Sequence, residues 1–494
     1  MNKNYFRYLI RNRRILILFC GAVFLAVSLL WSLNSAERTP GYRFYSIASM
    51  AAVLVVGLSY VLPVLLFSFV HRRSSCDMYF SLPVSRREMR ITSIAFAFAV
   101  IYGYFLITIV IAYVFCSQGV FPFPRLLALL GFGALMTLTL IVVHSAVYLL
   151  ANTEADGMIL LAAYSMLVIT AFMTEGLTME NMIIGREIDT ENLVSLMLSP
   201  IWLSARTYGS ILSTNGWLYE SFSLTRFLVL VIYAIAGWFG LRHEFDQRKT
   251  ERAEMISDHP LAYPTVINLY AVLILLLLAG NVIRYREPGY SVLYAVLLAC
   301  YAAGTFVYKR RLVPDWKMIG LFVGEAVLTL ALMAAMWTTR GFGQADNYSL
   351  TKGETITYEY NMQTKPGSLG EIPDSFGTPP VYVSFELTFP VKDIENYREA
   401  TDLLDRYRKG LIDWYYEYGG EPEYGYFGIY NTANGRNTNR YTYRPCAALS
   451  REDLITLNRY CDVLITDYSH DDWEVSDMPL ANYLKVMEQL KSAE

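Results

Sequence analysis

Nine long apolar stretches alternate with short polar segments over the first two thirds of the chain. A helix needs about 20 mainly apolar residues to cross the hydrocarbon core of a bilayer. The stretches cover residues 15–33, 47–70, 91–115, 126–150, 158–173, 227–241, 265–283, 290–308 and 316–337. They predict a polytopic α-helical membrane protein of about nine spans. The first stretch follows a basic segment but is too long for a cleaved signal peptide, so we expect an uncleaved anchor.

The pattern changes after residue 340, where strand-like and helix-like segments replace the apolar runs. Residues 354–360 and 381–389 alternate like strands, and 425–430 with 439–444 form a hairpin predicted around Asn434 and Gly435. Helices are predicted at 393–416, 450–465 and 480–490. We therefore expect a soluble α+β domain at 341–494, after six spans within residues 1–255 and three additional transmembrane helices at 256–340.

Composition supports this division. Apolar residues make up 54% of the chain and charged residues 17%, with a mean hydropathy of +0.31. Residues 341–494 hold 14 Lys and Arg against 25 Asp and Glu, whereas residues 1–340 hold 27 against 19. These values exclude a disordered chain, a disulfide-stapled miniprotein and a globally basic nucleic-acid binder.

Lysine and arginine in the short loops predict the orientation. The segments on the same side of the membrane as the N-terminus carry 17 of these residues, and the loops on the other side carry 8. The positive-inside rule therefore places the N-terminus in the cytoplasm, and nine spans then place residues 341–494 outside. The first residues predict an amphipathic helix on the inner leaflet, with Tyr5 and Leu9 on one side and Arg7 and Arg11 on the other. An alternative is that these basic residues only precede the first span.

The sequence lacks the signatures of an enzyme. It contains no G-x-x-x-x-G-K-[ST] phosphate loop, and His243-Glu244 is followed by Gln247 where a zinc protease helix has histidine. We therefore expect no catalytic residue, no metal and no cofactor in this chain.

A few isolated residues allow two interpretations each. His144 and Glu325 lie inside predicted spans, and each contacts either a substrate or proton, or only a neighbouring helix through a hydrogen bond. Cys446 and Cys461 can form a disulfide if their domain lies outside the cell. The apolar parts of loop 174–226 indicate either a short re-entrant element or a compact outer loop.

The loop after the second span, residues 71–90, carries the strongest signal. Its second half places Pro83 after an apolar run, and Ser85 with Glu88 has the spacing of a capping box that starts the next helix. Exposed apolar groups on a short loop need a surface to pack against. The alternative is a basic loop that only fixes topology.

Two segments resemble one family. The run Met78-Tyr79-Phe80-Ser81-Leu82-Pro83-Val84-Ser85-Arg86-Arg87-Glu88 resembles the loop after the second span of bacterial type-2 ABC exporter permeases, and Gln247-Arg248-Lys249-Thr250-Glu251-Arg252-Ala253 is similar to the tail after their sixth span. Ser199-Pro200 is similar to a turn before that span. The resemblance covers residues 1–255. With its three extra spans and its terminal domain, the chain looks like a member of an elaborated Firmicutes-type subgroup of these permeases.

The resemblance implies a function and a set of contact residues. It implies a permease subunit that works as a dimer of transmembrane subunits with separate ATPase subunits, which bind the ATP. The ATPase-coupling residues would be Asp77, Met78, Tyr79, Leu82, Pro83, Val84, Arg86, Arg87 and Glu88, with a second contact at Arg248, Lys249, Glu251 and Arg252. The alternative function is a membrane-anchored sensor or scaffold whose outer domain binds a ligand. The substrate stays open.

Overall fold

The computed structural model describes most of the chain. The described residues are 2–34, 40–117, 121–186, 198–212, 224–255, 257, 259–286, 289–309, 316–346, 353–364, 381–419, 425–433, 436–443, 448–467 and 477–485. They form two compact units. Unit 1 contains Met1–Phe172, Glu191–Ala271 and Tyr301–Asp315, and unit 2 contains Met173–Thr190, Val272–Cys300 and Trp316–Glu494. These units cut across the three segments expected from the sequence, whose boundaries stay predictions.

Within the described residues, nine helices are long and apolar enough to cross a membrane. They are α2 (Arg14–Asn34), α3 (Pro40–Phe67), α5 (Arg86–Cys116), α6 (Phe123–Tyr148), α7 (Glu154–Met182), α10 (Leu224–Asp246), α11 (Tyr263–Tyr285), α12 (Gly289–Lys309) and α13 (Trp316–Thr338). Each falls on one of the nine predicted stretches, so the expectation of a mainly helical, polytopic chain agrees with the structure. Helices α7 and α10 extend beyond the predicted stretches at both ends.

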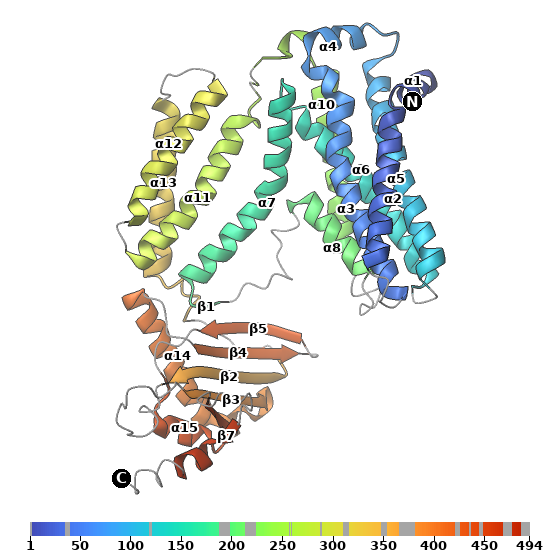
Figure 1. Cartoon of the computed structure of the whole chain (residues 1–494). Helices are drawn as coiled ribbons and strands as arrows, with labels where there is room; N and C mark the ends of the chain where they lie inside the picture. Colours follow the sequence, from blue (N-terminus) through green and yellow to red (C-terminus); the bar gives the residue numbers. More distant parts are fainter. Residues whose placement is uncertain are drawn as a thin grey trace. The chain divides into compact units, whose positions relative to one another are not determined.

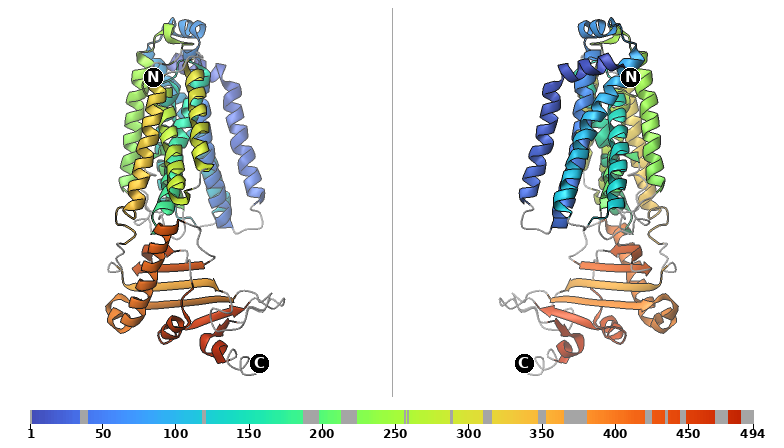
Figure 2. Two further views of the ribbon diagram at one scale, coloured as in Figure 1. Left: turned by 90° about the vertical axis from the view of Figure 1, so that its left-hand side faces the viewer. Right: turned by 90° about the vertical axis from the view of Figure 1, so that its right-hand side faces the viewer.

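Unit 1 is a helix bundle whose core lies between α3, α5, α6 and α10 (Figure 1). Helices α6 and α10 approach closely because Gly237 has no side chain: a Cβ there would lie 2.9 Å from Cγ2 of Val143. A short N-terminal helix, α1 (Lys3–Asn12), buries Tyr5 and Leu9 against the bundle. Figure 2 shows α1 and α4 (Arg73–Phe80), both in blue, at the same end of the bundle.

Helix α8 (Pro200–Leu212) belongs to the loop expected to hold either a re-entrant element or a compact outer loop. It has 13 residues, which is too few to cross a bilayer. It packs against α3, α6 and α10, and its Tyr208 hydroxyl donates to the Ala48 carbonyl at 2.9 Å. The rest of that loop, 187–197 and 213–223, lies outside the described residues.

Unit 2 contains a seven-stranded antiparallel sheet with the order β1-β5-β4-β2-β3-β6-β7. Its strands are β1 (Gly185–Arg186), β2 (Thr355–Thr364), β3 (Val381–Pro390), β4 (Gly425–Ala433), β5 (Arg436–Tyr443), β6 (Val463–Asp467) and β7 (Asp477–Pro479). The short 3-10 turn η5 (Val391–Tyr397) leads into α14 (Arg398–Tyr418), which covers the apolar face of the sheet together with α15 (Arg451–Leu457). The predicted strands and the hairpin are present, although Asn434 and Gly435 lie outside the described residues.

One predicted helix is wrong in its second half. The segment 450–465 is helical only as α15, after Ser450 caps it by accepting from the Asp453 backbone N–H at 3.2 Å. The chain then turns, and Val463 begins β6, which pairs with β3. A run of β-branched residues next to an open sheet edge favours this strand over a longer helix. Strands β1 and β7 have no counterpart among the predicted elements, and only the first residues of the predicted helix at 480–490 are described.

Gly419 ends α14, and a substitution at this position tests the packing of unit 2. Its φ of +65° lies in the left-handed region, and an added Cβ would lie 2.2 Å from the Arg284 carbonyl oxygen. We expect Gly419→Ala to lower the free energy of unfolding by about 2–3 kcal/mol, because backbone strain and a steric clash add. The matched control is Gly410→Ala inside α14, where the described residues leave the Cβ position open. It should stabilise the helix by up to about 1 kcal/mol. Thermal unfolding of the purified chain measures both, and equal effects would contradict the account.

Candidate functional site: the loop between α3 and α5

The loop that carries the strongest sequence signal folds into a short, ordered elbow. We use "elbow" for residues 68–85, which comprise η1 (Ser68–His71), α4 (Arg73–Phe80) and the connection to Ser85. Pro83 stands in the connection, where no backbone N–H is needed for a helix. Ser85 then caps α5: its hydroxyl accepts from the Glu88 N–H at 3.2 Å, while the Glu88 carboxylate accepts from the Ser85 N–H at 3.3 Å. The predicted capping box is therefore present.

Aromatic rings attach the elbow to the end of α10. Phe69 of η1 stacks on Tyr79 of α4 with ring centroids 4.2 Å apart. Phe245 of α10 then packs edge-on against Phe67, Phe69 and Phe80. Contacts of this kind add about 0.5–1.5 kcal/mol each to the burial of the rings. The elbow is thus fixed on its inner side.

Arginines reinforce the attachment by donating to backbone carbonyls. Arg86, at the start of α5, donates to the carbonyls of Asp246 and Arg248 at 3.1 and 2.7 Å, and its guanidinium lies 4.1 Å from the centre of the Phe80 ring. Arg73 of α4 donates to the Ala253 carbonyl at 3.0 Å. The Asp246 carbonyl at the end of α10 lacks a helical partner, and the Arg248 and Ala253 carbonyls lie in the segment that follows, so these cations satisfy groups that otherwise need water.

A buried ion pair continues the same connection one turn into α5. Arg90 is 2% exposed and forms a two-pronged interaction with Asp246, Nε to Oδ1 at 3.2 Å and Nη2 to Oδ2 at 3.0 Å. Its guanidinium also lies 4.7 Å from the centre of the Trp238 ring. A planar, bidentate pair of this type fixes distance and angle together. The first turns of α5 and the last turn of α10 are therefore joined rigidly.

The predicted coupling residues divide into two groups. Asp77, Met78, Leu82, Pro83 and Arg87 are exposed. Tyr79, Val84, Arg86 and Glu88 are partly buried and hold the elbow in place. Burial also raises the pKa of the Cys76 thiol on the inner side of α4, which keeps that thiol protonated.

The second predicted contact lies beside the elbow. Lys249, Glu251 and Arg252 are exposed around the short turn η3 (Thr250–Arg252), whereas Arg248 is buried and donates to the Ala151 carbonyl at 2.8 Å. The fold thus brings together two segments that are about 160 residues apart in sequence.

Sequence reasoning missed Arg90, Asp246 and Phe245, which join these segments. An arginine and an aspartate at the same end of two apolar stretches were the available signal, but only the helix pairing shows that they meet.

The remaining candidate residues lie apart from this site. His144 makes the interhelical contact expected of it: Nδ1 lies 3.0 Å from the Ser59 hydroxyl, and the ring stacks on Tyr60 at 4.1 Å. Glu325 is half-buried on α13 in unit 2, and its Oε2 has no hydrogen-bond partner in the described part of the chain. Cys446 lies outside the described residues, and the Cys461 thiol donates to the Leu457 carbonyl at 3.6 Å.

Comparisons with known proteins add no identity to this geometry. No protein family, no characterised protein and no solved structure matches the chain. Among the described residues, no group of three or more His, Cys, Asp or Glu side chains is placed to hold a metal ion.

The Arg90–Asp246 pair is open to a direct test. We expect Asp246→Asn to lower the free energy of unfolding by about 2–3 kcal/mol, because it leaves the buried Arg90 charge without its counterion. The matched control is Arg242→Gln, since Arg242 lies 4.0 Å from the same carboxylate but is 62% exposed, and it should cost less than about 1 kcal/mol. Thermal unfolding and a double-mutant cycle with Arg90→Gln measure the coupling. A cycle with no coupling energy would show that the pair does not stabilise the bundle.

Proposed function

We propose that this chain is the transmembrane permease subunit of an ATP-driven exporter and that the elbow receives motion from a separate ATPase subunit. The observation that carries the proposal is the two-sided character of the elbow. Its inner side is fixed by Phe245 and Arg86, while Met78, Leu82 and Pro83 present apolar surface outward. Exposed apolar groups on a rigid support are typical of a protein–protein contact.

The attachments of the elbow give this proposal a mechanism. A displacement of α4 would be passed to α5 through the short connection at Ser81–Ser85 and to α10 through Arg86, Arg90 and the Phe245 contacts. The two candidate spans α5 and α10 would then move together. ATP hydrolysis takes place in the partner subunit, and this chain contributes the helices through which the motion passes.

The proposal includes a placement in the membrane. The N-terminus and the elbow lie in the cytoplasm of a bacterial cell, in accord with the excess of Lys and Arg in the segments on that side. An odd number of spans then places the C-terminal domain outside. Two copies of this chain, or this chain and a homologue, would form the transmembrane part with two ATPase subunits.

Truncation of Leu82 tests the proposed contact. With a phosphate-loop ATPase encoded next to this gene, we expect Leu82→Ala to weaken association about tenfold, because an apolar side chain at a contact is lost. The matched control is Leu261→Ala, which removes the same atoms from an exposed leucine of unit 1 outside the elbow and should leave affinity within about twofold. Co-purification and titration measure both.

The outcome is decisive in either direction. Equal affinity of the Leu82 variant and the wild type would remove the coupling role and leave the membrane-anchored sensor. Hydrolysis of ATP by the complex, and its stimulation by candidate substrates, then tests export itself.

Labelling of single cysteines tests the orientation. In a variant without native cysteines, Asn396→Cys on the exposed side of η5 should react with a membrane-impermeant maleimide in intact cells, whereas Ser81→Cys in the elbow should react only after lysis. The physical reason is that a charged reagent does not cross the bilayer. The opposite pattern would invert the proposed topology, and labelling of both in intact cells would contradict nine crossings.

A further inference from the structure

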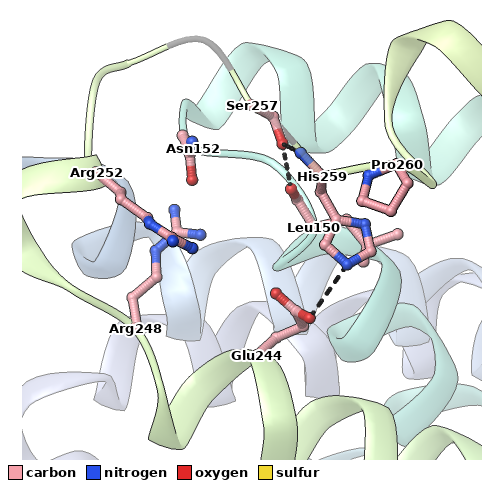
Figure 3. A pocket seen from close by; sticks show the side chains of 8 residues that line it. All are labelled: Leu150, Asn152, Glu244, Arg248, Arg252, Ser257, His259 and Pro260. Carbon is pink, nitrogen blue, oxygen red and sulfur yellow. Dashed lines mark hydrogen bonds and ion pairs between the residues drawn. The ribbon is translucent and has the colours of Figure 1, made fainter.

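A polar cavity lies beside the elbow, at the end of unit 1 where α6, α7, α10 and α11 begin or end (Figure 3). Its volume is about 220 Å³. The lining residues come from the α6–α7 connection, from the end of α10 with η3, and from the segment before α11: Leu150, Asn152, Glu244, Arg248, Arg252, Ser257, His259 and Pro260. The cavity shares Arg248 and Arg252 with the second predicted coupling contact, but no residue of the elbow lines it.

The wall of the cavity is built by specific hydrogen bonds. Arg248 is 5% exposed and donates to the carbonyls of Leu149 and Ala151 at 3.3 and 2.8 Å. The Ser257 hydroxyl donates to the Leu150 carbonyl at 2.7 Å. These three hydrogen bonds hold the α6–α7 connection in place, so the cavity is formed before any ligand enters it.

The charges that line the cavity favour an anion. Two guanidinium groups, those of Arg248 and Arg252, face one carboxylate, that of Glu244. The carboxylate is already engaged, since Nε2 of His259 lies 3.5 Å from its Oε1. Nδ1 of His259 accepts from the Leu261 N–H at 3.2 Å, so Nε2 is the ring nitrogen that faces Glu244. Figure 3 shows this pair apart from the two arginines, which point to the same region below Asn152.

The two arginines exceed the single carboxylate of the lining in charge. No ion pair of 4.0 Å or less joins a described carboxylate to either side chain, whereas Arg90 pairs with Asp246 and Arg72 with Glu154. Burial lowers the pKa of Arg248; the charge of Glu244 opposes this shift from a longer distance, and the charge of Arg252 adds to it. Two like charges held together in a partly closed space gain most from an anion that bridges them.

We propose that this cavity binds a phosphate group, held between the guanidinium groups of Arg248 and Arg252. A phosphate presents several charged oxygens to which guanidinium groups donate, and it fits within the volume. The cavity lies at the ends of candidate spans, where headgroups of anionic lipids are found, so a phospholipid and free phosphate are two sources of the same chemistry. Occupancy would tie the end of α10 to the α6–α7 connection. This inference does not depend on the exporter proposal.

Binding to the purified full chain tests the site. After delipidation in a neutral detergent, the chain is titrated with short-chain phosphatidylglycerol, with phosphatidylcholine of the same chain length and with inorganic phosphate. The rise in unfolding temperature with ligand concentration gives the affinity. We expect Arg252→Gln to weaken binding about tenfold, because one charge-assisted contact is lost. The matched control is Lys249→Gln, which removes an exposed charge three residues away that does not line the cavity, and it should change affinity less than about twofold.

Each outcome either supports the site or overturns it. Saturable binding of phosphatidylglycerol alone that Arg252→Gln weakens supports a lipid headgroup, and competition by inorganic phosphate supports the free ion. Absence of binding by all three probes overturns the proposal, as does an equal loss in the two variants, since surface charge alone would then explain it. Because Arg252 is exposed, its variant should keep the unfolding temperature of the unliganded protein, and Arg252→Lys replaces it if it does not.

Discussion

Arg86 and Arg90, in the first turns of α5, hold the last turn of α10, and the rest of this end of the molecule depends on that attachment. The final carbonyls of a helix carry partial negative charge and have no partners of their own. Arg86 donates to the last of them, that of Asp246, and to the Arg248 carbonyl just beyond the helix, while Arg90 binds the Asp246 side chain. Arg90 is buried and Asp246 is 30% exposed, so solvent screens this pair less than a fully exposed one, and two hydrogen bonds to one carboxylate restrict its rotation. The last turn of α10 and the first turns of α5, which are far apart in sequence, are therefore held together as one rigid unit.

The elbow and the cavity both depend on these joined ends of α5 and α10, and each uses a different side of them. On one side, the rings of Phe69 and Phe80 pack against Phe245 and Tyr79 stacks on Phe69, so that α4 is supported along its inner face while Leu82 after it stays exposed. On the other side, Arg248 uses its carbonyl to accept from Arg86 and its side chain to support the α6–α7 connection. A single residue thus links the coupling surface to the phosphate site that we propose, although neither proposal requires the other.

Unit 2 combines residues from three separate parts of the chain. The hydroxyls of Tyr415 and Tyr416 on α14 donate to the carbonyls of Asn181 and Met182, and Arg284 of α11 donates to the Asn181 side chain at 2.6 Å. Gly185 and Arg186 then add a short strand to β5. A segment that follows the candidate span α7 therefore adds an edge strand to the sheet. The acidic domain thus contacts residues at the end of α7 as well as following α13.

The sequence alone determined the nine apolar helices, because about 20 consecutive apolar residues have few other stable environments than a bilayer or a helical core. It also determined the capping box at Ser85 and most strands of unit 2, since caps and alternation are local patterns. Tertiary structure decided the rest. Segment 463–467 became a strand because β3 offered unpaired backbone groups beside it, and Arg248 became a buried brace because the α6–α7 connection passes over it. The contact of Arg90 with Asp246 likewise depends on how α5 packs near α10, and the residue pattern within one helix does not indicate where another helix lies.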